Sequence, residues 1–426
     1  MISYYFPPLG GIGSLRALKF GQYLPEFGWD PMVVAPRHGA YYQDPTLQFD
    51  ERKVMRTASL EISRTAKRAI GARGGNDTKP AEIGPALQRI RAAARRWIYR
   101  PDPQVGWYPF AVRAGRRLLR GGKFDAMFSS SFPITAHLVA RRLHQEFGIP
   151  WVAEFRDLWT DLTRYDSLRR QRFDEAIERD VLHGATEVVS VSEGYAKVLS
   201  ERAERRVSVI TNGFDPVDFR GRQLSSRPLA TYVGTYYPDR QDLRPVLRAL
   251  GELVRSGDLS ELRIRFVGDF PESLKEALGS AGLADAVECT GFVAHQQALD
   301  HMEDSTLLLL AGPVPGSFSR SKLAGHIVSK VFEYLGSRRP ILYIGEPGSE
   351  VENLVRQFPA VAHVASGDVQ GAKDAILALI RQGPDVSRRG LEPYTRRSLA
   401  RRLAEVFNDA CGRTGGSVAG RGSCAG

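Results

Sequence analysis

A glycine-rich turn near the start of the chain could bring backbone groups close to a phosphate or a sugar. Gly10 and Gly11 follow a Pro-Pro pair and precede the helical pattern of residues 15–29. Glycines between a strand and a helix let backbone N–H groups approach an anion at the positive end of the helix dipole. The dinucleotide fingerprint would require a third glycine where this chain has Arg16, which disfavours an NAD enzyme. The alternative is a tight turn that binds no ligand.

A second candidate segment is residues 329–335, with the sequence SKVFEYL. Ser329 is predicted to cap a helix that begins with Lys330. Lys330 and Glu333 are three residues apart and therefore share one face of its first turn. A lysine there can neutralise a phosphate, and a carboxylate one turn later can accept hydrogen bonds from a ribose diol. The alternative is an i,i+3 ion pair on the protein surface.

Arg240 provides a further positive charge. It follows the apolar run 230–235, and so lies just beyond the carboxyl end of a predicted strand. Open α/β sheets bind their ligands at that edge. We therefore expect Arg240 and Lys330 to hold one diphosphate together.

These residues need a scaffold, and the hydrophobic pattern predicts one of class α/β. Short β-branched runs alternate with helical patterns along most of the chain, which indicates two doubly wound, Rossmann-like parallel sheets covered by helices. Strands are expected at residues 1–6, 31–36, 125–131, 151–157, 187–193 and 207–211, and then at 230–235, 263–269, 287–292, 306–311, 341–345 and 362–366.

The domain boundaries follow from changes in composition. Residues 212–228 are rich in Gly, Pro, Asp, Ser and Arg, which predicts a linker between two domains, 1–212 and 213–395. This linker is also expected to act as a hinge that closes a cleft over a substrate and excludes water. A helix is predicted at 396–411, followed by a disordered Gly/Ser-rich tail at 412–426.

The positive charge of the chain is concentrated in one region. The 426 residues carry a formal net charge of +11, and residues 52–120 contain seventeen basic residues against four acidic ones. Within this region, residues 86–100 predict a basic amphipathic helix suited to an anionic membrane surface. An ordinary helix with solvated arginines is the equal alternative. Nucleic acid is not the expected partner, since no nucleic-acid-binding motif accompanies the charge.

No apolar run reaches the length of a membrane-spanning helix, and no signal segment opens the chain. A cytoplasmic protein is therefore expected, with residues 52–120 available for peripheral binding to the inner membrane face.

Taken in order and spacing, several segments resemble the GT-B glycosyltransferases that use nucleotide sugars, particularly the family 4-like group of bacterial polysaccharide and glycolipid assembly. The segments are 4–13 (YYFPPLGGIG), 150–160 (PWVAEFRDLWT), 211–215 (TNGFD), 232–235 (YVGT) and 329–335 (SKVFEYL). The resemblance covers nearly the whole chain. It implies two Rossmann-like domains that face a cleft, with the acceptor on the side of the first domain and the nucleotide sugar bound to the second.

The resemblance also implies roles for individual residues. Gly10 and Gly11 would face the donor diphosphate, which Arg240 and Lys330 would bind with the help of Ser329. Glu333 would hold the ribose hydroxyls. Arg156 and Asp157 become catalytic or acceptor-side candidates.

Two positions depart from the family pattern. Many relatives have a second glutamate eight residues before the ribose-binding one, where this chain has Gly325, so recognition of the donor sugar is not carried over. Many also have a histidine after the fourth strand of the first domain, where this chain reads SSSFP at 129–133. His137 comes later, in a predicted helix, where we expect it to have a core or helix-face role rather than a catalytic one.

The expected reaction is the transfer of a sugar to a lipid-linked or soluble acceptor with retention of anomeric configuration, as the resemblance implies. The chain has no D-x-D motif, so we expect metal-independent transfer without a cofactor, with the departing diphosphate stabilised by Arg240, Lys330 and backbone amides. Two alternatives stay open. One is a nucleotide-sugar 2-epimerase of the same fold, and the other is a non-enzymatic basic protein that binds polyanions or membranes.

Overall fold

A computed structural model describes residues 1–37, 43–60, 100–162, 165, 167–314, 325–384 and 389–412. The chain forms two compact units, which we call the first and second unit. The first comprises Met1–Val191, Ala196–Ile210 and Ala400–Gly426, and the second comprises Ser192–Tyr195 and Thr211–Leu399. The basic helix predicted at 86–100 lies outside the described residues except for Arg100, and so does the tail from residue 413.

The second unit is built on a six-stranded parallel sheet of strand order β12-β11-β10-β7-β8-β9. Its direction of winding reverses between β7 and β10, which is the topological switch point of such a fold. The strands are β7 (Leu229–Val233), β8 (Arg263–Val267), β9 (Val287–Gly291), β10 (Leu307–Ala311), β11 (Ile341–Gly345) and β12 (Val361–Ala365).

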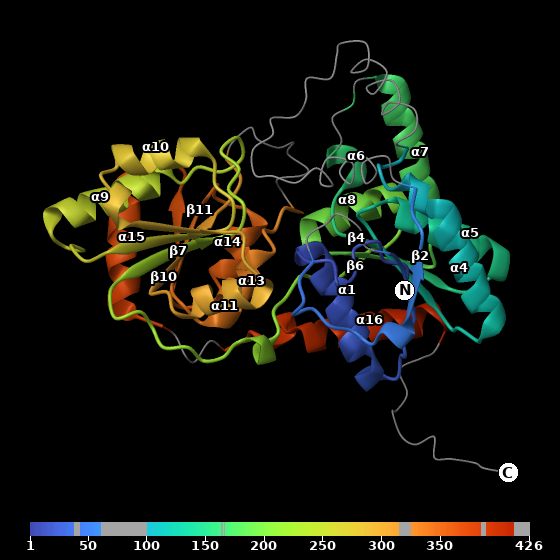
Figure 1. The fold of residues 1–426 in the computed structure, drawn as a ribbon. Helices are drawn as coiled ribbons and strands as arrows, with labels where there is room; N and C mark the ends of the chain where they lie inside the picture. Colours follow the sequence, from blue (N-terminus) through green and yellow to red (C-terminus); the bar gives the residue numbers. More distant parts are fainter. Residues whose placement is uncertain are drawn as a thin grey trace, which may run out of the picture. The chain divides into compact units, whose positions relative to one another are not determined.

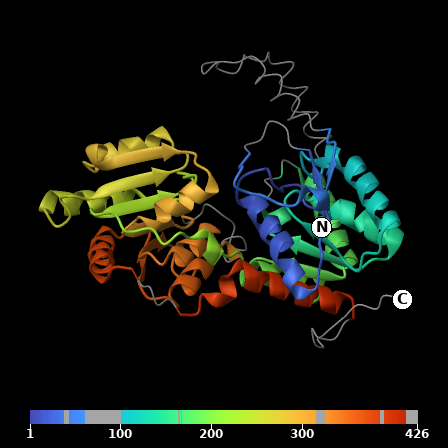
Figure 2. The ribbon, with the colours of Figure 1, turned by 60° about the horizontal axis from the view of Figure 1, so that its bottom comes forward.

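Helices cover both faces of this sheet (Figures 1 and 2). One apolar cluster joins the strands to α9, α10 and α15, and another joins them to α11, α13 and α14. Burial on both faces explains the uninterrupted run of leucines in β10. The helices are α9 (Arg244–Ser256), α10 (Glu272–Ser280), α11 (His295–Glu303), α13 (Lys330–Ser337), α14 (Glu350–Val355) and α15 (Val369–Gln382).

The first unit has a parallel sheet in which Ile2 joins two parts. Ile2 bridges Val34 on one side and Ser129 on the other, and so links β2-β1 to β3-β4-β5-β6. The strand predicted at 1–6 is therefore reduced to a single bridge, and β2 was not predicted. The strands are β1 (Val33–Pro36), β2 (Val54–Thr57), β3 (Met127–Ser130), β4 (Trp151–Phe155), β5 (Glu187–Ser190) and β6 (Ser208–Val209).

The first unit also contains most of the remaining helices. Two helices, α8 and α16, have residues in both units. The α-helices are α1 (Ile12–Tyr23), α4 (Tyr108–Gly121), α5 (Thr135–Phe147), α6 (Trp159–Leu162), α7 (Leu168–Gly184), α8 (Glu193–Ala203) and α16 (Arg396–Ala410). Short 3-10 helices lie at Leu24–Phe27, Glu51–Lys53, Val105–Trp107, Pro216–Asp218, Ala284–Ala286 and Glu392–Tyr394.

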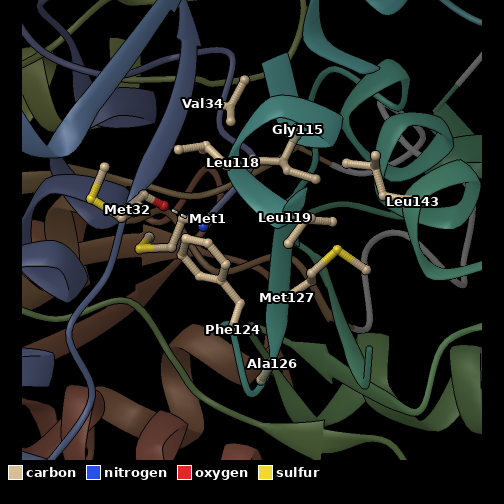
Figure 3. A pocket seen from close by; sticks show the side chains of 11 residues that line it. Met1, Met32, Val34, Gly115, Leu118, Leu119, Phe124, Ala126, Met127 and Leu143 are labelled. Carbon is tan, nitrogen blue, oxygen red and sulfur yellow. Dashed lines mark hydrogen bonds between the residues drawn. The ribbon is translucent and has the colours of Figure 1, made fainter. Parts of the chain in front are cut away.

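A small apolar pocket of about 40 Å³ lies at the amino edge of the first unit's sheet (Figure 3). It is lined by Met1, Met32 and Met127 from the strand side and by Leu118 and Leu119 of α4. Because open α/β sheets bind ligands at the carboxyl edge, this pocket is a packing feature rather than the candidate site.

The second unit resumes at Thr211, close to the predicted boundary at residues 212–213, and the segment 212–228 belongs to that unit rather than standing between the two. Phe214 is only 6% exposed, forms a β-bridge with Thr395 and belongs to the apolar cluster of α13. A Cβ at Gly336 of α13 would lie 2.5 Å from the Phe214 ring, so glycine makes room for it. Because the segment is mostly polar, its sequence did not reveal that Phe214 is buried.

Among the described residues, no helix has the length and apolar character needed to cross a membrane. The described chain therefore offers no candidate span.

The glycines at the carboxyl edge of the second unit's sheet give a test of the fold. Gly268 has φ +133°, and a Cβ there would lie 2.8 Å from the carbonyl oxygen of Gly234. We expect Gly268→Ala to lower the free energy of unfolding by roughly 2–4 kcal/mol, through backbone strain and overlap. Gly279→Ala is the matched control in α10, where the added Cβ meets no atom and a gain of up to about 1 kcal/mol is expected. Equal urea midpoints for the two variants would contradict the proposed strain.

Candidate functional site

The candidate site in the second unit lies where β7 and β10 diverge. The two strands pair at Ala230 and Thr231 of β7, and their pairing ends before Val233. The N–H of Val233 donates instead to the Tyr334 hydroxyl at 2.9 Å, and its carbonyl accepts from Lys330 Nζ at 2.8 Å. Since buried backbone groups must find partners, these two contacts hold α13 against the end of β7.

The Lys330 ammonium lies in a largely uncharged pocket. It sits 3.7 Å from the centroid of the Tyr232 ring, and a Cβ at Gly234 would lie 3.4 Å from Nζ. Among the described residues, no carboxylate pairs with this ammonium. Burial lowers the pKa of Lys330 to about 7. A bound phosphate would supply the counter-charge and restore the ordinary pKa.

The Glu333 side chain contacts His295 and not Lys330. Its Oε1 lies 2.9 Å from Nε2 of His295, the first residue of α11. The surface ion pair considered between Lys330 and Glu333 is thus not formed. The predicted capping by Ser329 is also wrong, because Ser329 has helical dihedrals and makes no side-chain capping bond.

Arg240 lies in a turn after β7 and makes separate contacts. Its side chain is 51% exposed, with Asp239 at 3.5 Å, and its guanidinium is 5.7 Å from the Tyr237 ring centroid. Its backbone carbonyl accepts from Val314 N at 2.8 Å. A joint grip of Arg240 and Lys330 on one diphosphate stays a prediction.

The glycine-rich turn of the first unit precedes α1 directly. Gly11 occupies the N-cap position of α1 with φ 92° and no side-chain cap, a conformation that favours glycine. A Cβ at Gly11 would meet no atom within 4 Å, so there is open space beside the turn. The role of Gly10 and Gly11 in binding a donor stays a prediction.

Arg156, just after β4, ties this turn to the loop after β3. Its guanidinium donates to the carbonyls of Gly13 at 2.9 Å, Phe132 at 3.0 Å and Ser131. Burial lowers the pKa of Arg156, while Glu154 and Asp157 oppose that shift. These contacts indicate that Arg156 positions the two loops; the catalytic roles of Arg156 and Asp157 stay predictions.

Arg16, where the dinucleotide fingerprint has glycine, forms a buried ion pair that the sequence did not reveal. Its Nε donates to Glu154 Oε1 at 2.8 Å, and its terminal nitrogen donates to the carbonyl of Ile210 at 2.7 Å. Ser130 donates to the second carboxylate oxygen at 2.6 Å. The arginine thereby fixes α1 to the sheet.

The structure accounts for one departure from the family pattern, the glycine at position 325, and shows where His137 lies. His137 is fully buried and contacts Ser129 Oγ through Nδ1 at 2.7 Å, so of the two expected roles, core or helix face, the structure shows the core. Burial, with a smaller effect of Arg156, lowers its pKa to about 3. Gly325 packs against Tyr195, whose ring would be 2.2 Å from a Cβ at that position. A glutamate at position 325 does not fit this packing.

Sequence reasoning also missed His295 and Tyr232 as members of the site. His295 lies 38 residues from Glu333, in a segment without a distinctive motif. Tyr232 belongs to the quoted run 232–235, but only the fold places its ring under Lys330. Among the described residues, no group of three or more His, Cys, Asp or Glu side chains is arranged to hold a metal.

Comparison with known proteins agrees with the predicted family. Residues 13–213 match the family model described as glycosyl transferase 4-like domain. Among curated proteins, none matches the chain.

Among solved structures, sucrose-phosphate synthase from Thermosynechococcus elongatus is 14% identical, with a TM-score of 0.54 and coverage of 96% of this chain and 95% of that one. HepE from Anabaena, solved with UDP and glucose, is 13% identical, with a TM-score of 0.52 and coverage of 97% and 96%. The lipopolysaccharide outer core galactosyltransferase WaaB is 12% identical, with a TM-score of 0.51 and coverage of 96% and 97%. These likenesses support the predicted fold class.

The lowered pKa of Lys330 predicts a pH-dependent cost to stability. In the unfolded chain the lysine titrates near its ordinary value, so between pH 7 and 10.5 the unfolded state binds more protons and stability rises with pH. Lys330→Met removes this pH dependence but also leaves the Val233 carbonyl without its donor. We therefore expect the free energy of unfolding of the parent protein, relative to that of the variant, to rise by about 3 kcal/mol between pH 7 and pH 10.

Urea unfolding of both proteins at pH 7, 8.5 and 10 measures the difference. The same change of stability with pH in both proteins would contradict a desolvated ammonium.

Proposed function

We propose a donor, an acceptor class and a mechanism for this chain, which its glycosyl transferase 4-like domain at residues 13–213 identifies as a glycosyltransferase with the GT-B fold. The donor is a nucleoside-diphosphate sugar, bound at the carboxyl edge of the second unit's sheet. The acceptor is a lipid-linked or soluble glycan of polysaccharide or glycolipid synthesis. The reaction retains the anomeric configuration and requires no metal ion.

The observation that carries the proposal is the Lys330 ammonium at the switch point, without a carboxylate partner among the described residues. A diphosphate at the first turn of α13 would meet this ammonium and the positive end of the helix dipole. Glu333, in the same turn, would accept hydrogen bonds from the ribose hydroxyls. HepE, which shares the fold, was solved with UDP and glucose, which supports this class of donor.

The chemistry breaks the anomeric C–O bond to the diphosphate and forms a new C–O bond to the acceptor hydroxyl. Negative charge grows on the departing diphosphate, and stabilising it is the main catalytic task. Lys330, Arg240 and the amides near Gly10 and Gly11 would supply that stabilisation. In a retaining reaction on one face of the sugar, the acceptor proton passes to the departing phosphate, and Asp157 would orient the acceptor hydroxyl.

The acceptor side of the proposal rests on charge. The surplus of basic residues in 52–120 would attract an anionic leaflet and bring a lipid-linked acceptor to the enzyme. WaaB, which shares the fold, is a galactosyltransferase of the lipopolysaccharide outer core. We therefore propose that transfer takes place at the cytoplasmic face of the membrane.

A thermal-shift panel of UDP, GDP, dTDP, CMP and NAD without metal tests the donor class. Specific binding to the native state raises the unfolding midpoint by mass action, so we expect one nucleoside diphosphate to stabilise the chain. Incubation of the corresponding nucleotide sugar without acceptor then distinguishes a transferase from a 2-epimerase. Stabilisation by polyanions alone, without nucleotide preference, would overturn the proposal.

The same binding reaction should take up protons through Lys330. At pH 7.5 a group with a pKa of about 7 is mostly neutral, and a diphosphate would protonate it again. We expect roughly 0.5–0.8 protons to be taken up per bound nucleoside diphosphate, measured by calorimetry in buffers of different ionisation enthalpy. In Lys330→Arg the side chain does not titrate, and the uptake should disappear; an unchanged uptake would exclude Lys330 as its source.

Glu333→Ala tests the ribose contact. Loss of hydrogen bonds from a carboxylate to two hydroxyls should weaken nucleoside-diphosphate binding by about 1–3 kcal/mol. The control is Glu272→Ala in α10, whose carboxylate is on the surface beside Lys275; this variant should bind as the parent does. Equal affinities of Glu333→Ala and the control would refute the role of Glu333.

A further inference from the structure

His295 contacts the Glu333 carboxylate from a separate helix. The Nε2–Oε1 distance is 2.9 Å, and the two side chains are 22% and 9% exposed. A carboxylate only accepts hydrogen bonds, so Nε2 must carry the proton of this contact. His295 is therefore a donor to Glu333 whether its ring is neutral or charged.

The surroundings of His295 favour its charged form because of Glu333. Burial and Arg396 act to lower its pKa, but Glu333, assisted by Asp218, outweighs them and raises the pKa above its ordinary value. The first residue of a helix is also an unfavourable position for a cation, because the helix dipole is positive there. The carboxylate on α13 thus offsets two effects that disfavour a charged histidine.

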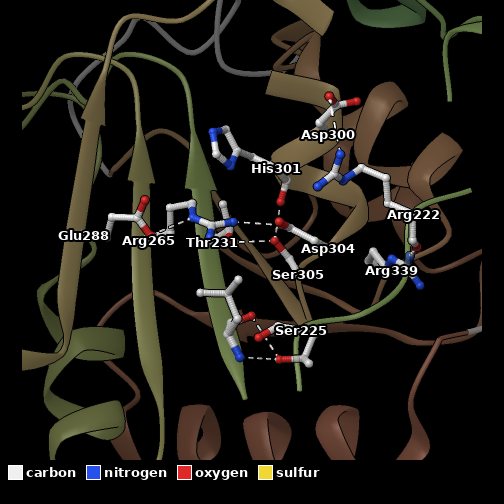
Figure 4. Close-up of polar contacts among 12 residues, drawn as sticks. Arg222, Ser225, Thr231, Arg265, Glu288, Asp300, His301, Asp304, Ser305 and Arg339 are labelled. Carbon is white, nitrogen blue, oxygen red and sulfur yellow. Dashed lines mark hydrogen bonds and ion pairs between the residues drawn. The ribbon is translucent and has the colours of Figure 1, made fainter. Parts of the chain in front are cut away.

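Helix α11 is fixed at its far end, which keeps His295 in place. Ser305 Oγ donates to the carbonyl of His301 and accepts from Thr231 Oγ1, both at 2.6 Å. Arg265 of β8 pairs with Asp304 at 2.8 Å, next to the same turn (Figure 4). These contacts anchor the end of α11 to two strands of the sheet.

The side of α11 is held as well. Both oxygens of Glu303 accept backbone N–H groups, from Arg220 and Gly221, at 2.8 Å each. Near the start of the helix, Gln296 donates to the carbonyl of Asp218 at 2.9 Å. A helix anchored along its length can hold a partner side chain in one orientation.

We propose that His295 is a positioning residue for the nucleotide site: its Nε2–H fixes Oε1 of Glu333 and so orients the carboxylate toward the ribose diol of the donor. The inference rests on the proposed function, because that function assigns Glu333 to the ribose. His295 itself touches the carboxylate and not the nucleotide. It contributes selectivity for ribose over deoxyribose, since a carboxylate that rotates freely gains less from a second hydroxyl.

The test compares UDP, GDP and ADP with their 2′-deoxy counterparts by calorimetry. In the wild-type protein, the diphosphate that binds should bind more tightly than its 2′-deoxy form. We define the ribose preference as the ratio of the affinity for the nucleoside diphosphate to the affinity for its 2′-deoxy form. His295→Leu removes the hydrogen-bond donor to Glu333, and we expect it to reduce this ratio five- to tenfold while the affinity for the 2′-deoxy form stays within twofold. His295→Gln offers a nitrogen donor of similar reach, and we expect it to restore most of the ratio. If His295→Leu does not fold, His295→Ala takes its place.

His301→Leu is the matched control, because it removes the other histidine of α11, at the end away from Glu333. It should leave both affinities unchanged. A structural role of His295 alone would lower the two affinities equally and would not be rescued by glutamine, and either result overturns the inference.

The Glu333→Ala variant separates this inference from the proposed function. If the wild type does not prefer ribose, or if Glu333→Ala leaves the ratio unchanged, the role of Glu333 itself fails. If Glu333→Ala abolishes the ratio and His295→Leu does not reduce it, only the role of His295 fails.

Discussion

The backbone of Val233 sets the constraint on which the second unit's site depends. Where β7 and β10 separate, the N–H and the carbonyl of this residue lose their strand partners, and a buried polar group without a partner costs about 1–3 kcal/mol. Tyr334 and Lys330 of α13 satisfy both groups. The same contacts that dock the helix therefore place an ammonium group at the carboxyl edge of the sheet, where the proposed donor would bind.

Arg16, Arg156 and Lys330 differ in what balances their positive charge. Arg16 forms an ion pair with the carboxylate of Glu154 and so connects α1 to the sheet. Arg156 is held by three backbone carbonyls, which fix it without neutralising it. Lys330 has one carbonyl and an aromatic face. A bound anion is stabilised more strongly where the positive charge of a side chain is less completely balanced by the protein. Of these three residues, Lys330 is therefore the strongest candidate for a phosphate contact.

The sequence predicted the strands well because most are buried on both faces and read as apolar runs. It missed β2 (Val54–Thr57), which is short and lies in a basic region, and it mistook the segment with Phe214 for a linker. Among the candidate residues, Lys330 and Glu333 were found because they lie in one short motif. Their partners were not, since Val233 and His295 are 97 and 38 residues away in the chain, and only the parallel topology brings them together.

The geometry of α13 explains why its lysine, glutamate and tyrosine are spaced as they are. At 3.6 residues per turn, Lys330 and Tyr334 are neighbours on one face, and both reach Val233. Glu333 is turned away from Tyr334 by about 100° and meets α11 instead. A ligand that contacts both Lys330 and Glu333 must therefore lie at the first turn of α13, between the end of β7 and the start of α11. For the proposed donor, the diphosphate would face Lys330 and the ribose diol would face Glu333.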